Sequence, residues 1–401
     1  NDWLNNLKVR FSWGKNGNDN IGDFRYTVLT QGGNNYGFGM AGGEKEYISS
    51  KASGLANPDL KWEESEQYDI GLDFGFLNNK VTFTVDWFKK KTNGMLKDMN
   101  IPSYVGETKP IGNVGDMDNT GWEFEAAYKF NVSDAKFQIK GNLSYLKNEL
   151  KKLGNAAGYE TYDNVSQLGN ISRAEAGEPF PYFWGFKTDG ILQNWDEVNE
   201  YTSKYDVHPN GSECRPGFVR FVDINNDGII DDNDRTKIGK GTPDWTFGIT
   251  LNAAWKGFDF MMFWQGTAGN QIFDASRRID IANANMPSWI LGRWTGEGTS
   301  DKYPIYIAGD AANWVASDLY IHDGDYMRMK NIELGYTIPE FITKRVFISR
   351  LRVYVAAENL VTLTKYHGFD PEISSAATSS GVDFGVYPQP RVWRIGCNVS
   401  F

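Results

Sequence analysis

The sequence predicts an all-β protein, a transmembrane antiparallel β-barrel wall of about ten strands with long extracellular loops. Polar and apolar residues alternate with period two over many segments, which is the pattern of a strand with two different faces. Several of these segments are longer than the about five or six residues of a globular strand, and about 9–11 residues carry a tilted strand across a bilayer. Aromatic residues make up 15% of the chain, but no apolar run is long enough for a transmembrane helix.

The first clear pair of strands flanks the short turn Asn78-Asn79. Every second residue from Tyr68 to Phe76 is apolar, and the same holds from Val81 to Trp87, while the residues between them are polar or glycine. Such alternation predicts one apolar and one polar face. Further strands with this pattern are expected at 122–130, 137–145, 247–255, 258–264, 326–338 and 350–362, and at the end of the chain from Trp393 to Phe401.

The predicted connections alternate between short and long. Short ones lie near Asn78, Ser133 and Lys256, and long ones cover about 15–60, 97–113, 151–243, 268–325 and 363–388. Bacterial barrels have short periplasmic turns and long outer loops. If the last strand descends to the periplasm, parity makes 151–243 a single outer excursion. We therefore expect barrel strands at 1–150, a large extracellular excursion at 151–243, and C-terminal barrel strands at 244–401.

A soluble β-sandwich or propeller is the alternative to a membrane barrel. It would not need long strands with polar residues along one whole face and aromatic residues along the other. Aromatic residues at strand ends also suit the girdles that barrels place at the two membrane interfaces. These are Trp13, Trp87, Trp122 and Trp255. Dependence on detergent would separate the two interpretations.

Composition and motifs exclude several functions. A net charge of −10 argues against nucleic acid as a partner. Cys214 and Cys397 have no metal-binding spacing and are expected to be unpaired, and the three histidines are scattered. No nucleophile elbow or zinc-protease motif occurs, and no carboxylate pair stands out as a glycosidase site. We predict no enzyme and no catalytic residue. No signal peptide opens the chain, and Asn1 precedes a strand directly, so an upstream segment is expected.

Several stretches resemble the SusC/RagA family of TonB-dependent outer-membrane transporters of Bacteroidota. The most specific is DGDYMRMKNIELGY at 323–336. The others include NPDLKWE at 57–63, QYDIGLD at 67–73, NTGWE at 119–123, FWGFKTDGI at 183–191, GFDPE at 368–372 and YPQPR at 387–391. They follow one another in the family's order and span essentially the whole chain.

The resemblance implies the C-terminal part of a larger plugged barrel in the outer membrane of a Gram-negative bacterium. Such barrels have about 22 strands, so the plug and the earlier strands would lie upstream. It further implies active import of oligosaccharides or peptides, energy from the TonB complex, a SusD-like surface lipoprotein as partner and a dimer of transporter–lid pairs. The alternative is a passive outer-membrane or surface protein for ligand binding or adhesion. An upstream TonB box would separate the two.

An acidic loop in the outer excursion has the spacing of an EF-hand calcium loop. Ca²⁺ takes six to eight oxygen ligands, and Gly228 permits the sharp turn that such a loop requires. The predicted ligands are Asp223, Asn225, Asp227, the carbonyl of Ile229, Asp231 and Asp234. Asp234 stands where the motif has glutamate, so bidentate ligation is less favoured. The two interpretations are a structural Ca²⁺ that orders the loop and an acidic turn without metal.

Two further groups of residues are candidates for function. Tyr182, Phe183 and Trp184 form an aromatic cluster that could stack on sugar rings or hold peptide side chains, or could simply pack a loop core. The charged residues on the polar faces of the strands are expected to line the wet interior of the barrel. These are Asp69, Asp73, Glu123, Glu125, Lys330 and Glu333.

Overall fold

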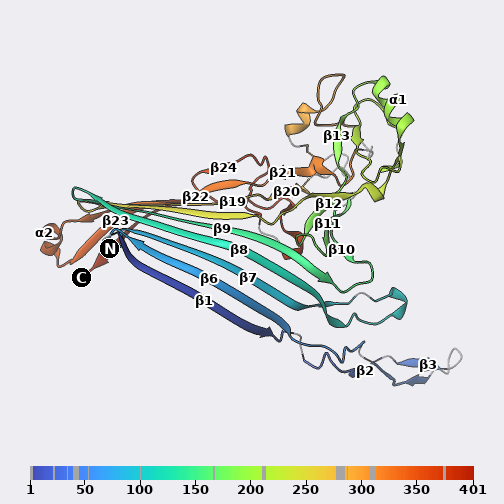
Figure 1. Ribbon diagram of the computed structural model, residues 1–401, viewed down its shortest axis with the longest axis horizontal. Helices are drawn as coiled ribbons and strands as arrows, with labels where there is room; N and C mark the ends of the chain where they lie inside the picture. The colour runs from blue at the N-terminus through green and yellow to red at the C-terminus, as the bar shows by residue number, and fades with distance from the viewer. Residues whose placement is uncertain are drawn as a thin grey trace.

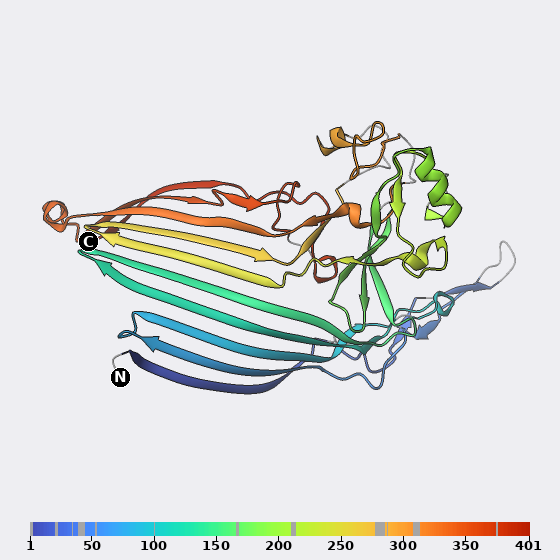
Figure 2. The same cartoon turned by 45° about the horizontal axis from the view of Figure 1, so that its top comes forward.

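One large antiparallel sheet dominates the computed structural model. The model describes residues 3–20, 23–33, 35–38, 45–52, 54–99, 101–165, 168–209, 214–276, 285–286, 288–307, 313–373 and 376–401. In spatial order the long strands are β1 (Leu4–Asn18), β6 (Glu63–Phe76), β7 (Val81–Asp98), β8 (Ile111–Val132), β9 (Ala135–Leu153), β18 (Trp245–Trp255), β19 (Phe258–Ala268), β22 (Tyr326–Ile338), β23 (Arg350–Glu358) and β26 (Val392–Ser400). The short β24 (Thr362–Thr364) also pairs with β22. The sheet is strongly curved, and β1 and β26 form its two edges (Figures 1 and 2).

Tight turns connect the strands at one end of the sheet, which we call the α2 end after α2 (Glu340–Thr343). Asn78 and Asn79 each have φ 58°, and Lys256 precedes Gly257 at φ 88°. Asparagine and glycine tolerate this left-handed region better than other residues, which explains why the chain reverses there. The connection after β22 is longer and contains α2 and a 3₁₀ helix, η6 (Lys344–Val346).

The opposite end of the sheet carries an outer region, which comprises the described residues of 154–244, 269–325 and 365–391 (Figure 1). It contains the sheet of β10 (Tyr159–Val165), β11 (Gly169–Glu175), β12 (Tyr182–Gly185) and β17 (Thr236–Gly239). It also contains the pair β13 (Thr188–Ile191) and β15 (Val219–Phe221), the parallel pair β14 (Asp206–Val207) and β16 (Ile229–Ile230), and the three-stranded sheet of β20 (Gln271–Asp274), β21 (Ile321–Asp323) and β25 (Val382–Asp383).

The helical elements of the outer region are short. They are α1 (Trp195–Lys204), η3 (Asp232–Asp234), η4 (Ser288–Gly292), η5 (Asp318–Tyr320) and η7 (Ala377–Ser379). The loop between β1 and β6 forms small hairpins from β2 (Thr30–Gly32), β3 (Tyr36–Phe38), β4 (Lys45–Tyr47) and β5 (Ser50–Ala52), and η1 (Ser103–Val105) follows β7. Within the described part of the chain, no helix is long and apolar enough to cross a membrane.

The buried apolar cores lie in the outer region, not on the large sheet. One core gathers around α1, β13 and β15, with Leu192 and Ile230 fully buried. The second joins segments far apart in the sequence, with Ile171, Phe273 and Val382 fully buried. Three separate outer segments therefore fold into one packed body at the end of the sheet.

The predicted fold class is confirmed, with two differences in detail. β7 and β8 have 18 and 22 residues and extend beyond the predicted strands. Their outer ends pair with each other through residues in which polar and apolar side chains do not alternate regularly. The strand predicted at 350–362 ends at Glu358. Asn359 has φ 52°, which turns the chain before β24 pairs with the upper part of β22.

Candidate functional site

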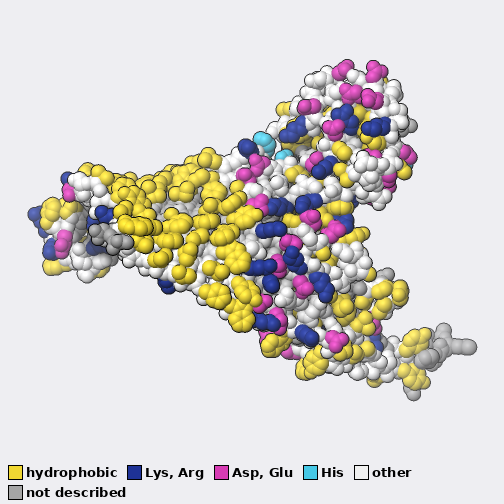
Figure 3. Space-filling view, viewed as in Figure 1, with side chains coloured by type: hydrophobic (Ala, Val, Ile, Leu, Met, Phe, Trp, Pro, Cys, Tyr) yellow, Lys and Arg dark blue, Asp and Glu magenta, His cyan; other side chains and the backbone are white. Residues whose placement is uncertain are grey.

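One face of the large sheet, which we call the aromatic face, carries a row of large rings near its outer end. Trp13 pairs with Tyr68, and Trp87 pairs with Trp122. Tyr145 continues the row to Trp245, with ring centroids 4.8 Å apart. The row crosses six neighbouring strands, from β1 to β18. Figure 3 shows the apolar surface that extends from this level toward the α2 end.

A second row of rings closes the aromatic face at the α2 end. Phe130 stacks on Phe137 with centroids 5.1 Å apart, and Phe258 lies 4.5 Å from Tyr336. β18 has 11 residues between the two rows. At about 3.3 Å per residue and a tilt of about 40°, such a strand spans roughly 28 Å, close to the hydrocarbon thickness of a bilayer. The aromatic face thus has the height of a membrane-spanning band.

Ion pairs lie directly beyond the outer row of rings on the same face. Lys89 Nζ lies 3.0 Å from Asp118 Oδ2, and Lys147 Nζ lies 3.2 Å from Glu149 Oε2. Figure 3 shows lysine, arginine, aspartate and glutamate side chains gathered beside the apolar surface, toward the outer region. The change from rings to charges within one or two residue steps marks the level where lipid headgroups would begin.

The other face of the sheet, the polar face, holds charged side chains in networks. Arg10 on β1 donates to Asp73 (2.9 Å) on β6 and to Asp86 (3.0 Å) on β7. Arg352 on β23 donates to Glu333 (2.6 Å) on β22 and also binds Asp259 on β19. Each network joins three strands, so the polar face is cross-linked where a barrel interior would be wet.

The six charged residues predicted to line the interior all lie on strands of the large sheet. Asp69 accepts from Ser12, Asp73 and Glu333 bind the arginines described above, and Glu125 pairs with Lys140 (3.0 Å). Glu123 is two residues from Glu125 and therefore shares its face. Lys330 binds Glu372 at 2.7 Å.

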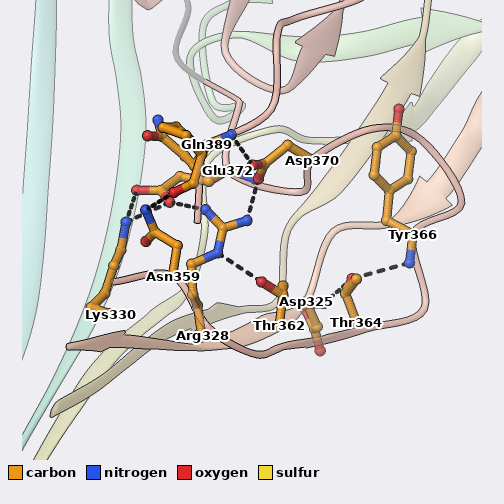
Figure 4. Close-up of polar contacts among 11 residues, drawn as sticks. Asp325, Arg328, Lys330, Asn359, Thr362, Thr364, Tyr366, Asp370, Glu372 and Gln389 are labelled. Atoms are coloured by element: carbon orange, nitrogen blue, oxygen red, sulfur yellow. Dashed lines mark hydrogen bonds and ion pairs between the residues drawn. The ribbon is translucent and has the colours of Figure 1, made fainter. Parts of the chain in front are cut away.

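A buried ion network fixes the last outer loop to the polar face (Figure 4). Arg328 on β22 donates through Nη2 to Asp370 and through Nη1 to Glu372 (2.7 Å). Its Nε donates to Thr362 Oγ1 (2.9 Å). The side chains of Arg328 and Asp370 are only 3% and 4% exposed. Buried charges are expensive unless each is paired, and here the guanidinium is hydrogen-bonded on all three nitrogens.

Hydrogen bonds also determine the charge state of Asp370. Burial opposes its ionisation, but donation from Arg328 and from the backbone N–H groups of Gln389 (2.8 Å) and Glu372 (2.8 Å) outweighs this effect. The pKa of Asp370 therefore lies below the ordinary aspartate value. The carboxylate stays charged and holds both ends of the loop, since Asp370 begins it and Gln389 ends it. We call Arg328, Lys330, Asp370 and Glu372 the loop clamp.

The acidic loop of the outer region uses its side-chain oxygens on its own backbone. Asp223 accepts from the N–H groups of Asn226 and Gly228, and Asp227 Oδ1 accepts from Ile229 N–H. Asp234 is fully buried and accepts from the N–H groups of Ile224 and Asp231. These are Asx-type contacts, in which a side-chain oxygen orders the turn that follows it.

The fit of a calcium ion to this loop is therefore incomplete. In the described part of the chain, no three acidic, histidine or cysteine side chains converge closely enough to hold a metal ion. Asn225 and Asp231 also accept backbone N–H groups, from Asp227 and Asn233, and Ile229 lies in β16. Calcium binding at this loop stays a prediction.

The aromatic cluster at 182–184 divides between core and surface. Tyr182 and Phe183 are only 2% and 1% exposed, and Phe183 packs in the second core. Trp184 is partly exposed, and the guanidinium carbon Cζ of Arg173 lies 4.1 Å from the centroid of its ring. Of these three residues, only Trp184 is accessible to a ligand in this structure.

Sequence reasoning missed the loop clamp. The motifs that contain Arg328 and Asp370 were singled out, but 42 residues separate them, and no local pattern indicates that they meet. The available signal is a lone arginine, three residues after Asp325, on the strand predicted at 326–338. Cys214 and Cys397 are unpaired, as predicted.

Comparison with known proteins agrees with this geometry. A family model described as TonB dependent receptor-like, beta-barrel matches residues 1–360. TonB-dependent receptor P39 of Formosa agariphila is 30% identical over 100% of this chain and 41% of its own length. TonB-dependent receptor SusC of Bacteroides thetaiotaomicron is 29% identical over 99% of this chain and 38% of its own length. The chain thus spans about two fifths of the length of these relatives.

Solved structures resemble the chain in fold. The RagAB peptide transporter aligns with a TM-score of 0.75 and 24% identity over 100% of this chain and 41% of that chain. The RagAB peptide importer in its open-open state aligns with a TM-score of 0.76 and 23% identity over the same shares. At this identity the likeness concerns the fold alone. Taken with the family model, the wall of alternating strands and its aromatic face show that this chain belongs to the TonB-dependent receptor-like β-barrel family.

Proposed function

We propose that the protein containing this chain actively imports oligosaccharides or peptides across the outer membrane of a Gram-negative bacterium. The observation that carries the proposal is the aromatic face, a band of bilayer height between two rows of rings on a curved antiparallel wall. Family membership adds the expectation of energy from a TonB complex.

The free-energy cost of exposing the aromatic face to water supports the proposed membrane location. Large apolar side chains stand exposed along it, among them Trp122, Ile249 and Leu334. Contiguous exposed apolar patches larger than a few hundred Å² are rare on soluble proteins and indicate contact with lipid or protein. Each inner strand of the sheet has a hydrogen-bonded partner strand on both sides, so the wall has no open strand edge between β1 and β26, as a lipid environment requires.

A surface lipoprotein of the SusD type is the partner we propose for the outer region. The support is the relationship to SusC, together with the likeness in fold to the RagAB peptide transporter. The packed outer body offers a preformed surface above the wall. A dimer of transporter–lid pairs belongs to the same proposal. The polar face and its ion networks would face the interior that an upstream plug fills.

A passive surface protein for ligand binding or adhesion is the second candidate, because outer loops displayed on a barrel could serve either purpose. Uptake of fluorescent oligosaccharides and peptides by intact cells separates the two. We expect internal fluorescence to require the full-length protein, TonB and a proton gradient. Binding that persists at the surface without TonB, with no accumulation inside, would support the passive candidate.

The cargo itself requires a direct measurement. The full-length protein would be purified in mild detergent, and its subunits and small ligands identified by native mass spectrometry. Co-purification of a lipoprotein and an oligosaccharide or peptide would support the importer and identify its cargo. A single species that stays in solution without detergent would contradict the proposal, and with it the membrane location.

A further inference from the structure

The connection between β22 and β23, residues 339–349, is longer than the reversal of the chain requires. The other connections at the α2 end take two to four residues, at 77–80, 133–134 and 256–257, whereas this one takes eleven. It contains α2 and η6 and extends beyond the ends of the neighbouring strands (Figures 1 and 2). We call it the α2 connection. Two residues suffice to turn the chain at this end, so the reversal alone does not explain its length.

The α2 connection is folded with a polar side chain inside and its apolar side chains outside. Thr343 is only 2% exposed, and its carbonyl accepts the N–H of Ile348 (3.2 Å). Ser349 donates its N–H to the carbonyl of Ser400 on β26 (2.8 Å), which fixes the turn to the sheet. Four large apolar side chains are exposed instead, and these are Phe341, Ile342, Val346 and Phe347. A turn that faces only water would favour the reverse arrangement.

The backbone at Phe347 is independent evidence that its ring has a purpose. Phe347 ends η6 with φ 60°, in the left-handed region, and its side chain is 89% exposed. Glycine and asparagine adopt this region readily, whereas a bulky residue there is strained. Phenylalanine at this position therefore strains the backbone and exposes a ring to water at once. The ring offsets that strain only where an apolar surrounding takes it up.

The aromatic face leads directly into the α2 connection. Ile338 lies two residues after Tyr336 and shares the aromatic face, as does Leu351, with which it pairs. Tyr336 belongs to the row of rings at the α2 end, and Pro339 follows it by three residues. At about 3.3 Å per residue and a tilt of about 40°, the connection starts roughly 8 Å beyond this row. That level is the headgroup layer, which adds about 5–8 Å on each side of the hydrocarbon core.

The connections at the α2 end are basic, although the whole chain has a net charge of −10. Their charged residues are Lys80, Lys256, Lys344 and Arg345 against Asp134 and Glu340. In the α2 connection, Lys344 pairs with Glu340 (2.9 Å), and Arg345 adds a further positive charge. Figure 3 shows apolar and basic side chains together at this end. Exposed rings combined with basic residues are typical of segments that lie in a membrane interface.

We propose that the α2 connection anchors the protein in the periplasmic leaflet. Its four apolar side chains lie at the boundary between headgroups and acyl chains, and Lys344 and Arg345 bind the phosphate groups of anionic phospholipids. The inference rests on the proposed membrane location, since short turns mark the periplasmic end of an outer-membrane barrel. The long stems of the two basic side chains follow the apolar surrounding, so their charged ends reach the phosphates from the same turn.

The first test measures the surrounding of the turn in a bilayer. A cysteine-free form of the complete protein would carry Val346→Cys with a nitroxide label, in nanodiscs of equal parts phosphatidylglycerol and phosphatidylcholine. Collisions of the label with oxygen, which concentrates in the bilayer, are compared with collisions with a water-soluble nickel chelate. We expect oxygen to dominate at position 346. The matched control is Asp134→Cys in the two-residue turn between β8 and β9, where we expect the nickel chelate to dominate.

Two substitutions test the ring and the charge separately. Phe347→Gly relaxes the backbone and removes the ring, so the label at position 346 should become several-fold more accessible to nickel while the turn stays folded. Arg345→Gln should lower the ratio of phosphatidylglycerol to phosphatidylcholine retained on the protein about fivefold, the effect of one basic residue at an anionic surface. Native mass spectrometry measures this ratio. Lys365→Gln, exposed at the outer end of the sheet, is the control and should keep the wild-type ratio.

Each outcome decides the inference. If nickel reaches the label at position 346 as readily as at position 134, the turn lies in water. If neither reagent reaches it, an upstream segment or a second copy covers the turn. Either result would overturn the anchor, and equal lipid ratios for Arg345→Gln and Lys365→Gln would overturn the headgroup assignment. A protein that never enters nanodiscs would instead refute the proposed membrane location, so the two failures are distinguishable.

Discussion

The guanidinium of Arg328 and the carboxylate of Asp370 form a buried ion pair that joins the outer end of β22 to the last outer loop. The loop begins near Asp370 and returns at Gln389, whose backbone N–H donates to the same carboxylate. Further along, Ser379 donates to Asp163 of β10, so the loop also contacts the outer body. This loop therefore makes side-chain contacts both with the wall, through Arg328, and with the outer body, through Asp163.

Arg328→Ala should detach the last outer loop from the wall. Removing one partner of a buried pair leaves an uncompensated charge and costs about 3–5 kcal/mol. Trypsin can cut after Lys365 and Arg391, so limited proteolysis should excise the loop much faster from the variant. Arg394→Ala is the control, because its pair with Glu358 is half-exposed and worth about 0–1 kcal/mol. Equal cleavage rates in both variants would contradict the clamp.

Acid should weaken the same contact. The pKa of Asp370 is lowered in the folded protein, so its contribution to stability is complete above the ordinary aspartate pKa of about 3.9 and is lost as the pH falls through the folded value. Hydrogen exchange of the Gln389 N–H, corrected for the intrinsic pH dependence, should be constant from neutral pH to about 4 and faster below. Asp370→Asn should show weaker protection that does not change over this range. If exchange of the Gln389 N–H also accelerates below pH about 4 in Asp370→Asn, a group other than Asp370 causes the change.

Gly335→Ala should disturb the second polar-face network. A Cβ atom there would lie 2.3 Å from Arg352 Nη2, so the guanidinium must leave its place between Asp259 and Glu333. We expect a loss of about 1–3 kcal/mol in the free energy of unfolding, measured by denaturant titration. Gly14→Ala is the control, since nothing lies within 4 Å of its Cβ position. Equal stability of the two variants would show that Arg352 finds other partners at no cost.

Much of the wall could be predicted because polar and apolar residues alternate along a strand whose two faces meet different surroundings. The strand predicted at 326–338 coincides with β22, and the turn at Asn78-Asn79 lies where local backbone preference puts it. The upper part of β8 was missed, because residues such as Asp116 and Asn119 pair in a polar surrounding where no lipid enforces alternation.

Contacts between distant segments could not be predicted for a different reason. The second core brings together Ile171, Phe273 and Val382 from three separate segments, and each segment alone reads as an irregular loop. The partial burial of the aromatic cluster has the same origin. Only the position of β12 against its neighbours decides that Phe183 points inward and Trp184 does not.

This difference between neighbours can be tested by substitution. Phe183→Ala should cost about 3–5 kcal/mol in stability, because it removes a fully buried ring. Trp184→Ala should leave the unfolding transition nearly unchanged. If Trp184 stacks on the cargo, the variant should lose roughly tenfold or more in affinity for it, measured on the purified full-length protein. Unchanged affinity would remove Trp184 from the candidates for cargo binding.

Asp234 provides the last prediction, which separates two ways of holding the acidic loop. Its buried carboxylate accepts hydrogen bonds from the N–H groups of Ile224 and Asp231. Asp234→Ala leaves these buried donors without an acceptor and should lower the free energy of unfolding by about 1–3 kcal/mol. Asp234→Asn should lower it less, because one oxygen acceptor remains. We expect Asp234→Ala to unfold at a lower temperature than the wild type, both with a calcium chelator and with added calcium. An ion that binds only the folded loop stabilises it by mass action. If chelator lowers the unfolding temperature of the wild type to that of Asp234→Ala, metal rather than hydrogen bonding orders the loop. That outcome would directly support the predicted calcium site.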